Sequence, residues 1–186
     1  METLKALRSR VSVSQLTEPF PNKNKMDIVY QSAFRAPDHG YLRPWRFIEV
    51  TGSGRSKLAN IFLKSAKRIG QVDEEKEKKI LALPFRAPMI IIIIANIIDK
   101  PKVPRIEQIQ STAAAAQNML IALYDMGYGA YWRTGNYSSE NNKNIAEELS
   151  LSAASEVMGY LYVGTPKAEL KKIPELNTKD FVTYFD

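Results

Sequence analysis

The side chains best suited to chemistry in this chain are cations, hydroxyls and aromatic rings that gather in three short segments. Arg10 and Ser12 could hold a phosphate or a polyol through charge-assisted hydrogen bonds. Residues 35–45 contain two arginines, the only histidine, two prolines and a tryptophan. Residues 132–134 read Trp-Arg-Thr. A ligand that combines a phosphate, a hydroxylated chain and a flat ring would use all three segments.

The segment at residues 35–45 is predicted to be a loop. Pro44 has no backbone N–H, and Pro37 disfavours the helical conformation for the residue before it. Arg35 and His39 are then expected at and just beyond the end of the preceding helix. Loops that carry polar and aromatic side chains often carry function, so this loop is a candidate site.

The sequence lacks the residues that several common types of catalysis and ligand binding require. No glycine-rich phosphate loop follows a predicted strand, and Gly-Ser-Gly at 52–54 is too short to serve as one. A serine–histidine–carboxylate triad could use only His39, and no serine stands in a Gly-x-Ser-x-Gly context. With no cysteine and one histidine, no metal site is expected. The paired acids at 74–75 and 147–148 fall in exposed-looking helices and are not expected to be catalytic.

Length and composition predict one globular domain. The chain has 186 residues and no composition break, so a single domain over residues 1–186 is expected. The absence of cysteine fits a reducing cytoplasm, and the first residues hold no apolar core of signal-peptide length. The net charge of +6 is spread along the chain, and solvated lysine-rich faces explain it without an anionic partner. Neither nucleic acid nor a membrane is expected as a partner.

Hydrophobic periodicity places the three segments on an α/β or α+β framework of about four or five strands. The apolar run at 88–95 is far too short to span a bilayer and is typical of a strand buried on both faces. Met26, Val29 and Ala33 form an apolar stripe that predicts a helix. Strands are predicted over residues 46–51, 88–95, 129–134 and 156–163, and helices near 4–7, over 24–35, from 58 to about 70, over 73–79, 107–126 and 141–149.

Two further features, a run of alanines and an aromatic C-terminal segment, have both a structural and a functional interpretation. Four consecutive alanines, residues 113–116, fall in the longest predicted helix, which Gly127 should close. They serve either helix propensity or the close approach of another backbone or ring. The chain also ends in an aromatic segment, Phe181–Phe185, whose rings need a surface to cover in this subunit or in a neighbour.

The order of these motifs resembles the nitroreductase superfamily of FMN-dependent oxidoreductases, and within it the compact bacterial YdjA-like group. Each motif is short, but their order and spacing are specific, and together they cover nearly the whole chain. They are Arg10–Ser12, Arg35–His39, Arg43–Trp45, Pro84–Pro88, Val103–Gln108, Trp132–Gly135, Gly159–Pro166 and Phe181–Phe185. The resemblance implies a nitroreductase-like α+β fold with a mixed central sheet flanked by helices. It also implies an intertwined homodimer with two FMN molecules at the subunit interface.

The resemblance implies which residues hold FMN. The segments at residues 10–12 and 132–134 match segments that bind FMN within one subunit of the family proteins. The first of them corresponds to the segment that holds the phosphate and the ribityl chain. The segment at residues 35–39 matches one that reaches FMN from the other subunit. Val11 replaces an arginine of the family pattern and removes one cation. The implied contacts are Arg10, Val11, Ser12, Trp132, Arg133 and Thr134 from one subunit, and Arg35 and His39 from the other.

The resemblance also implies two further sets of residues, one that contacts the acceptor and one that contacts the nicotinamide cofactor. Arg43-Pro44-Trp45 stands where the family often has Gln-Pro-Trp, so Arg43 and Trp45 form the implied substrate loop. The YdjA-like group also places nicotinamide contacts near the end of the long helix. The matching residues are Ala122, Leu123, Tyr124, Asp125, Met126 and Gly127.

The implied activity is that of an FMN-dependent NAD(P)H oxidoreductase that reduces nitroaromatic, quinone or related small acceptors. A ping-pong cycle would pass hydride from NADH or NADPH to flavin N5 and then to the acceptor, so no side chain is expected to be a catalytic acid or base. One alternative is an FMN carrier or sensor with little turnover. Another, suggested only by charge, is a basic nucleic-acid-binding domain, which would be colourless and bind with strong salt dependence.

Overall fold

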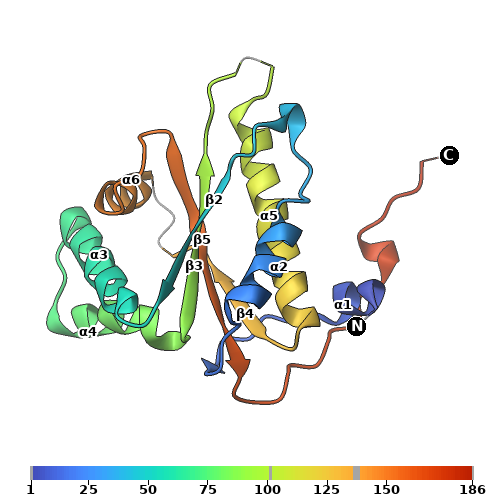
Figure 1. Ribbon diagram of the computed structural model, residues 1–186, viewed down its shortest axis with the longest axis horizontal. Helices are drawn as coiled ribbons and strands as arrows, with labels where there is room; N and C mark the ends of the chain where they lie inside the picture. The colour runs from blue at the N-terminus through green and yellow to red at the C-terminus, as the bar shows by residue number, and fades with distance from the viewer. Residues whose placement is uncertain (1, 101, 136–138, 186) are drawn as a thin grey trace.

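A five-stranded sheet forms the centre of the molecule, with helices on both of its faces (Figure 1). The computed structural model describes residues 2–100, 102–135 and 139–185. In spatial order the strands are β2 (Trp45–Thr51), β3 (Met89–Asn96) and β5 (Ser155–Pro166). Along its other edge, β5 pairs with β4 (Gly129–Arg133) and β1 (Leu16–Thr17).

The helices form two layers around this sheet (Figure 1). On one face lie α2 (Lys23–Ala33) and α5 (Arg105–Asp125), and on the other lie α3 (Gly54–Ile69), α4 (Glu74–Ala82) and α6 (Ser139–Glu148). The short helix α1 (Thr3–Ser9) contacts α5. Three 3-10 turns complete the described elements: η1 (His39–Tyr41), η2 (Leu83–Arg86) and η3 (Thr178–Asp180). None of the described helices is long and apolar enough to cross a membrane.

The isoleucine run of β3 explains why both faces of the sheet are covered. Its members Ile90–Ile94 are at most 1% exposed. Ile91 and Ile93 pack into the cluster under α2 and α5, whereas Ile90 and Ile92 pack into the cluster under α3 and α6. Because successive side chains of a strand point to opposite faces, a strand without polar positions requires a layer on each side. The predicted strand buried on both faces is confirmed.

The two helices on the first face also agree with the sequence predictions. Met26 and Val29 of α2 are buried. The helix begins where the side chain of Asn22 accepts a hydrogen bond from the Lys25 N–H at 3.0 Å. The 21 residues of α5 make it the longest described helix. It ends before Gly127, whose φ of +82° suits a residue that closes a helix.

The sequence predictions differ from the structure in three respects. β1 contains only Leu16 and Thr17, which is too short to produce a periodic pattern, and the sequence does not predict it. The mixed sheet implied by the resemblance also requires a parallel pair, whereas every strand pair in the described part of the chain is antiparallel. The α+β class and the central sheet flanked by helices are confirmed. β5 continues to Pro166, past its predicted end at Val163.

A β-bulge in β5 decides which side chains face α3 and α6. The register between β3 and β5 shifts at Met158, which has no partner in β3. Gly159 follows with a φ of +135°, a conformation open essentially only to glycine. The extra residue resets the alternation of the strand. As a result, Tyr160 and Tyr162 both pack into the cluster under α3 and α6.

The C-terminal segment extends away from the body of the molecule. After β5 the chain passes α1 and continues outward, away from the sheet (Figure 1). Phe181 is 72% exposed, Tyr184 is 77% exposed and Phe185 is 102% exposed. In the described structure these rings are therefore left mostly uncovered by their own subunit.

Candidate functional site

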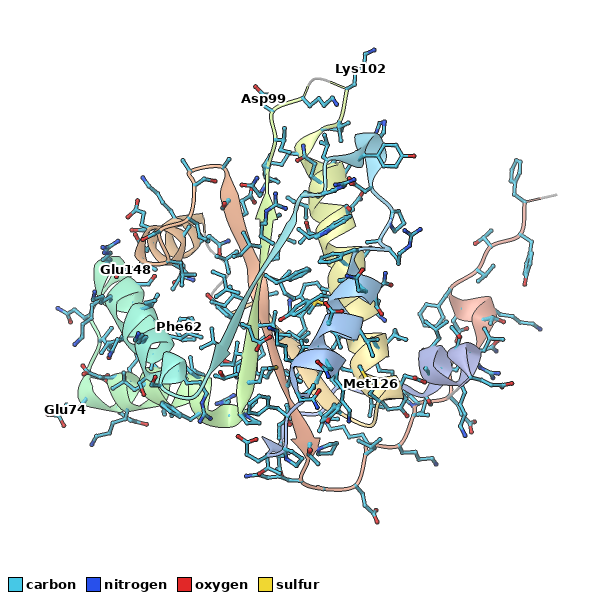
Figure 2. All side chains as sticks on the ribbon, in the orientation of Figure 1. Phe62, Glu74, Asp99, Lys102, Met126 and Glu148 are labelled. Atoms are coloured by element: carbon cyan, nitrogen blue, oxygen red, sulfur yellow. The ribbon has the colours of Figure 1, made fainter. Side chains whose placement is uncertain are left out.

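A cavity of about 450 Å³ lies between the sheet and the layer of α3, α4 and α6, and we call it the β4 cavity. Arg133, at the end of β4, lines it together with Gln71 and with Lys76 of α4. Phe62 points from α3 toward the sheet (Figure 2) and belongs to an apolar wall that Ile145 of α6 continues. An apolar pocket with a few polar groups is the usual form of a small-molecule site.

Two tyrosines of β5, Tyr160 and Tyr162, also line the β4 cavity, although neither is among the site residues predicted from the sequence. Tyr160 packs edge-to-face against Phe62, with ring centroids 4.8 Å apart. Burial raises the pKa of Tyr160, with a smaller contribution from Tyr162. Burial also raises the pKa of Tyr162, and the nearby Arg133 and Arg86 act in the opposite direction. Both phenols are therefore neutral hydrogen-bond donors. The available signal was two tyrosines within the otherwise apolar residues 157–163 of the strand.

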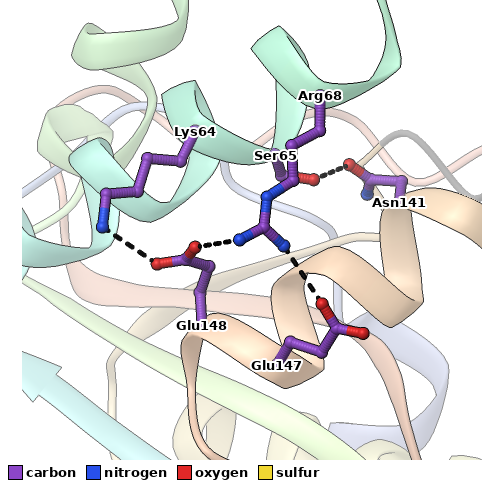
Figure 3. Close-up of polar contacts among 6 residues, drawn as sticks. All are labelled: Lys64, Ser65, Arg68, Asn141, Glu147 and Glu148. Carbon is purple, nitrogen blue, oxygen red and sulfur yellow. Dashed lines mark hydrogen bonds and ion pairs between the residues drawn. The ribbon is translucent and has the colours of Figure 1, made fainter.

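Polar contacts hold α6 against α3 and fix one wall of the β4 cavity (Figure 3). Arg68 of α3 forms ion pairs with Glu147 at 3.1 Å and with Glu148 at 2.7 Å. The fully buried Ser65 donates a hydrogen bond to Oδ1 of Asn141 at 2.9 Å. The paired glutamates of α6 thus position a helix, a role that fits the expectation that they are not catalytic.

The segment that carries Arg10, Val11 and Ser12 lies beside β4 and contains a buried donor without a partner. The N–H of Val13 donates to the carbonyl of Ala130 at 3.0 Å, which ties the segment to the strand. Nη1 of Arg10 is buried and makes no hydrogen bond with any described residue. Leaving such a donor unsatisfied costs about 1–3 kcal/mol, so this position favours an anionic ligand. Val11 is half-buried and Ser12 is exposed.

The loop at residues 35–45 borders a second cavity, of about 1110 Å³, beside α2 and β2, which we call the loop cavity. Arg35, Arg43 and Trp45 line it, although Trp45 is only 7% exposed and belongs to the core. His39 points elsewhere: its Nδ1 lies 2.5 Å from Oε2 of Glu107, at the start of α5. The predicted loop between a helix and a strand is confirmed, with the short turn η1 inside it.

The predicted FMN contacts form two sets, and the sheet separates them within one chain. Arg35 follows α2 and lines the loop cavity on one side, whereas Arg133 lines the β4 cavity on the other. Trp132 turns toward α2 and α5, and its Nε1 donates to the carbonyl of Met158 at 3.3 Å. Thr134 is exposed. The structure therefore brings Arg10–Ser12 to β4 and keeps Arg35 and His39 apart from it.

The predicted nicotinamide contacts at the end of α5 divide into packing residues and exposed residues. Leu123 is 0% exposed and belongs to the core. Ala122 and Met126 pack against the same cluster, and Figure 2 shows Met126 near the end of α5. Asp125 and Gly127 are exposed. The assignment stays a prediction, and these two exposed residues offer the surface that such a contact needs.

Comparison with known proteins points to one family. A family model described as "Nitroreductase family" matches residues 7–165. The chain is 35% identical over 188 residues to "Putative NAD(P)H nitroreductase YdjA" of Escherichia coli (strain K12), with 100% of each chain covered. The crystal structure of a nitroreductase-like family protein from Bacillus cereus has a TM-score of 0.83, with 24% identity, 100% of this chain and 97% of that chain covered. An FMN-dependent nitroreductase from Clostridium difficile R20291 has a TM-score of 0.73, with 24% identity, 98% of this chain and 99% of that chain covered. The chain belongs to the nitroreductase family.

Proposed function

We propose that this protein is an FMN-dependent NAD(P)H oxidoreductase that reduces nitroaromatic, quinone or related small acceptors. It would act in the cytoplasm as a homodimer with FMN at the subunit interface. The name of the Escherichia coli relative specifies NAD(P)H, and the name of the Clostridium difficile structure specifies FMN. The observation that carries the proposal is the buried, unpartnered Nη1 of Arg10, in a segment tied to the strand whose end lines an apolar cavity.

The side chains around β4 fit the parts of FMN. Arg10 and Ser12 supply a guanidinium and a hydroxyl for the phosphate and the ribityl chain. The β4 cavity supplies apolar walls for the ring, and Arg133 and Lys76 supply donors for the polar edge of the ring. A guanidinium beside an apolar cavity also stabilises negative charge that develops on a bound ring.

Bound FMN would supply hydride-transfer chemistry between NAD(P)H and the acceptor in a ping-pong cycle. The protein binds and orients the reactants and excludes water from the ring. Tyr160 and Tyr162 remain neutral donors in the β4 cavity because burial raises the pKa of each. No side chain of the cavity has to act as an acid or base.

Two subunits are needed because one chain does not bring all the predicted contacts together. Arg35 and His39 lie across the sheet from Arg133, and the side chain of His39 is 60% exposed. In the proposed dimer, Arg35 and His39 of one subunit reach the FMN of the other. The exposed rings at the C-terminus then cover the neighbouring subunit, which makes the dimer intertwined.

The double variant Arg35→Ala with His39→Ala is expected to retain less FMN through gel filtration than the wild type. It removes two polar contacts to the cofactor of the other subunit and, within its own chain, only the exposed His39–Glu107 pair. Flavin absorbance per protein measures the effect, and Lys78→Ala on the exposed face of α4 is the control. Unchanged flavin content in the double variant would sink the assignment of these two residues.

The proposed activity has a direct spectroscopic test. The purified protein, reconstituted with FMN and freed of excess cofactor, should be yellow and should bleach on anaerobic addition of NADH or NADPH. A nitroaromatic or quinone, added after the nicotinamide has been removed, should restore the colour. Tight flavin that neither nicotinamide reduces would favour the carrier or sensor. A protein that stays colourless after reconstitution would contradict both.

A further inference from the structure

The loop cavity gathers three guanidinium groups, and none of the carboxylates that line it forms an ion pair with them in the described structure. Arg35, Arg43 and Arg46 line it, and none of the three forms an ion pair within the described ranges. Nη1 of Arg46 donates instead to the carbonyls of Arg43 and Trp45, at 2.7 Å each. Guanidinium groups without an ionic partner are well suited to carboxylate and other planar anions.

The acids that line the same cavity do not cancel this charge locally. Oδ2 of Asp38 accepts a hydrogen bond from the backbone N–H of Arg43 at 2.7 Å. Oε2 of Glu49 accepts one from the hydroxyl of Tyr30 at 2.8 Å. Asp27, Tyr30 and Glu49 also border an adjoining hollow beside the start of α2, so two of the three acids lie at that end. At the loop end three arginines stand against one acid, Asp38, so this end of the cavity is positive.

The backbone that carries Arg43 is held in a strained conformation. Tyr41 has a φ of +55° and Arg43 a φ of +50°, although neither is glycine. The left-handed region costs such residues roughly 1–2 kcal/mol each, and such strain tends to persist where function requires it. The hydrogen bond from Arg43 to Asp38 and the bond from Arg46 to the carbonyl of Arg43 hold this turn. The turn presents a guanidinium and the ring of Tyr41, which is 86% exposed, together at the cavity.

Aromatic side chains complete the lining and suit a flat ligand. Tyr30 stacks on Phe47 with ring centroids 5.8 Å apart, and Trp45 and Phe34 contribute to the same cavity. Rings pack against aromatic faces with favourable offset or edge geometry. A ligand that carries an anionic group on an aromatic ring would therefore match the arginines of the loop end and the rings that line the rest of the loop cavity.

We propose that the loop cavity selects aromatic anions, such as ring carboxylates, as acceptors, and that Arg43 is the specificity-determining residue. This inference rests on the proposed function, because it names the acceptor class of that reductase. Arg43 would act on binding and not on hydride transfer, since a fixed cation attracts an anionic acceptor equally before and during the reaction. Its loss therefore raises KM for an anionic acceptor and leaves kcat nearly unchanged.

The test compares 4-nitrobenzoate with the neutral 4-nitrobenzamide on the FMN-loaded enzyme. Arg43→Gln should lower kcat/KM for 4-nitrobenzoate about tenfold, the size of one lost charge-assisted hydrogen bond. It should change the value for 4-nitrobenzamide by less than about twofold, because that acceptor carries no charge. Arg43→Lys keeps the charge and should restore part of the loss. Lys78→Gln, which removes one cation from the exposed face of α4, is the matched control.

A binding measurement makes the result independent of turnover. Isothermal titration of the same proteins with benzoate and benzamide, at low and high salt, should show benzoate binding that weakens with salt and with Arg43→Gln. If Arg43→Gln affected both acceptors equally, or affected neither, the inference would be overturned while the proposed reductase function would stand. A wild type that reduces neither acceptor would overturn the proposed function. In that case Arg43-dependent benzoate binding would still support anion selection, and Arg43-independent binding would refute it.

Discussion

Gly159→Ala is expected to lower the free energy of unfolding by about 3–4 kcal/mol, through backbone strain and overpacking together. The φ of Gly159 is +135°, which residues with a side chain rarely adopt. A Cβ atom at this position would also lie 2.6 Å from the carbonyl oxygen of Arg133 and 2.6 Å from Nε1 of Trp132. The first of these atoms belongs to the backbone and cannot rotate away. Urea unfolding of the purified variant measures the loss.

Gly52→Ala is the matched control for this substitution. Gly52 also has a positive φ, +49°, but a Cβ atom there would meet nothing within 4 Å. Its expected cost is only about 1 kcal/mol, the penalty for a left-handed residue other than glycine. If the Gly159→Ala variant were no less stable than the Gly52→Ala variant, the inference that the bulge packs too closely against β4 to admit a side chain would be wrong. Flavin retention should also fall in Gly159→Ala and stay near the wild-type level in the control.

The bulge links the fold to the proposed cofactor site. If β5 kept all its residues in a regular alternation from Val157, without the bulge, Tyr160 and Tyr162 would face α2 and α5, away from the β4 cavity. Gly159, which follows the extra residue Met158, lets the end of β4 approach β5 closely enough for Trp132 to donate to the carbonyl of Met158. The bulge and its glycine therefore set both the cavity lining and the position of the strand that carries Arg133.

Much of the fold could be predicted because its signals are local. The isoleucines of β3 and the apolar stripe of α2 predict buried elements directly, and Gly127 marks the end of α5. The two-residue strand β1 and the bulge at Gly159 leave no such pattern, because both depend on pairing with a distant strand. Periodicity places a strand but does not give its register or its partners.

The candidate site could be predicted only in part, for a similar reason. The motifs pointed to Arg10, Arg35 and Arg133, whose side chains stand in short and distinctive segments. They did not show that the sheet separates Arg35 from Arg133, since sequence order says little about which face a loop occupies. The walls of the β4 cavity come from six elements spread between residues 62 and 162, so residues such as Phe62 and Tyr162 have no common motif.

A chain that ends at Asp180 is expected to be monomeric and to lose most of its FMN. The deletion removes the rings of Phe181, Tyr184 and Phe185, which are 72%, 77% and 102% exposed and are left mostly uncovered by their own subunit. Burying apolar surface against a partner contributes roughly 25 cal/mol per Å², so these rings can supply much of the free energy of association. Light scattering after gel filtration measures the mass, and absorbance measures the flavin.

Two comparisons make this deletion decisive for the proposed dimer. Lys171→Ala with Lys172→Ala alters the same exposed segment without removing a ring, and this variant should stay dimeric. The double variant Arg35→Ala with His39→Ala should lose flavin and remain a dimer, because those residues reach the cofactor and not the tail. The shortened chain should lose both its flavin and its dimeric state, since a monomer lacks the Arg35 and His39 that the other subunit would supply. A shortened chain that stayed dimeric and kept its flavin would show that the C-terminal rings do not join the subunits.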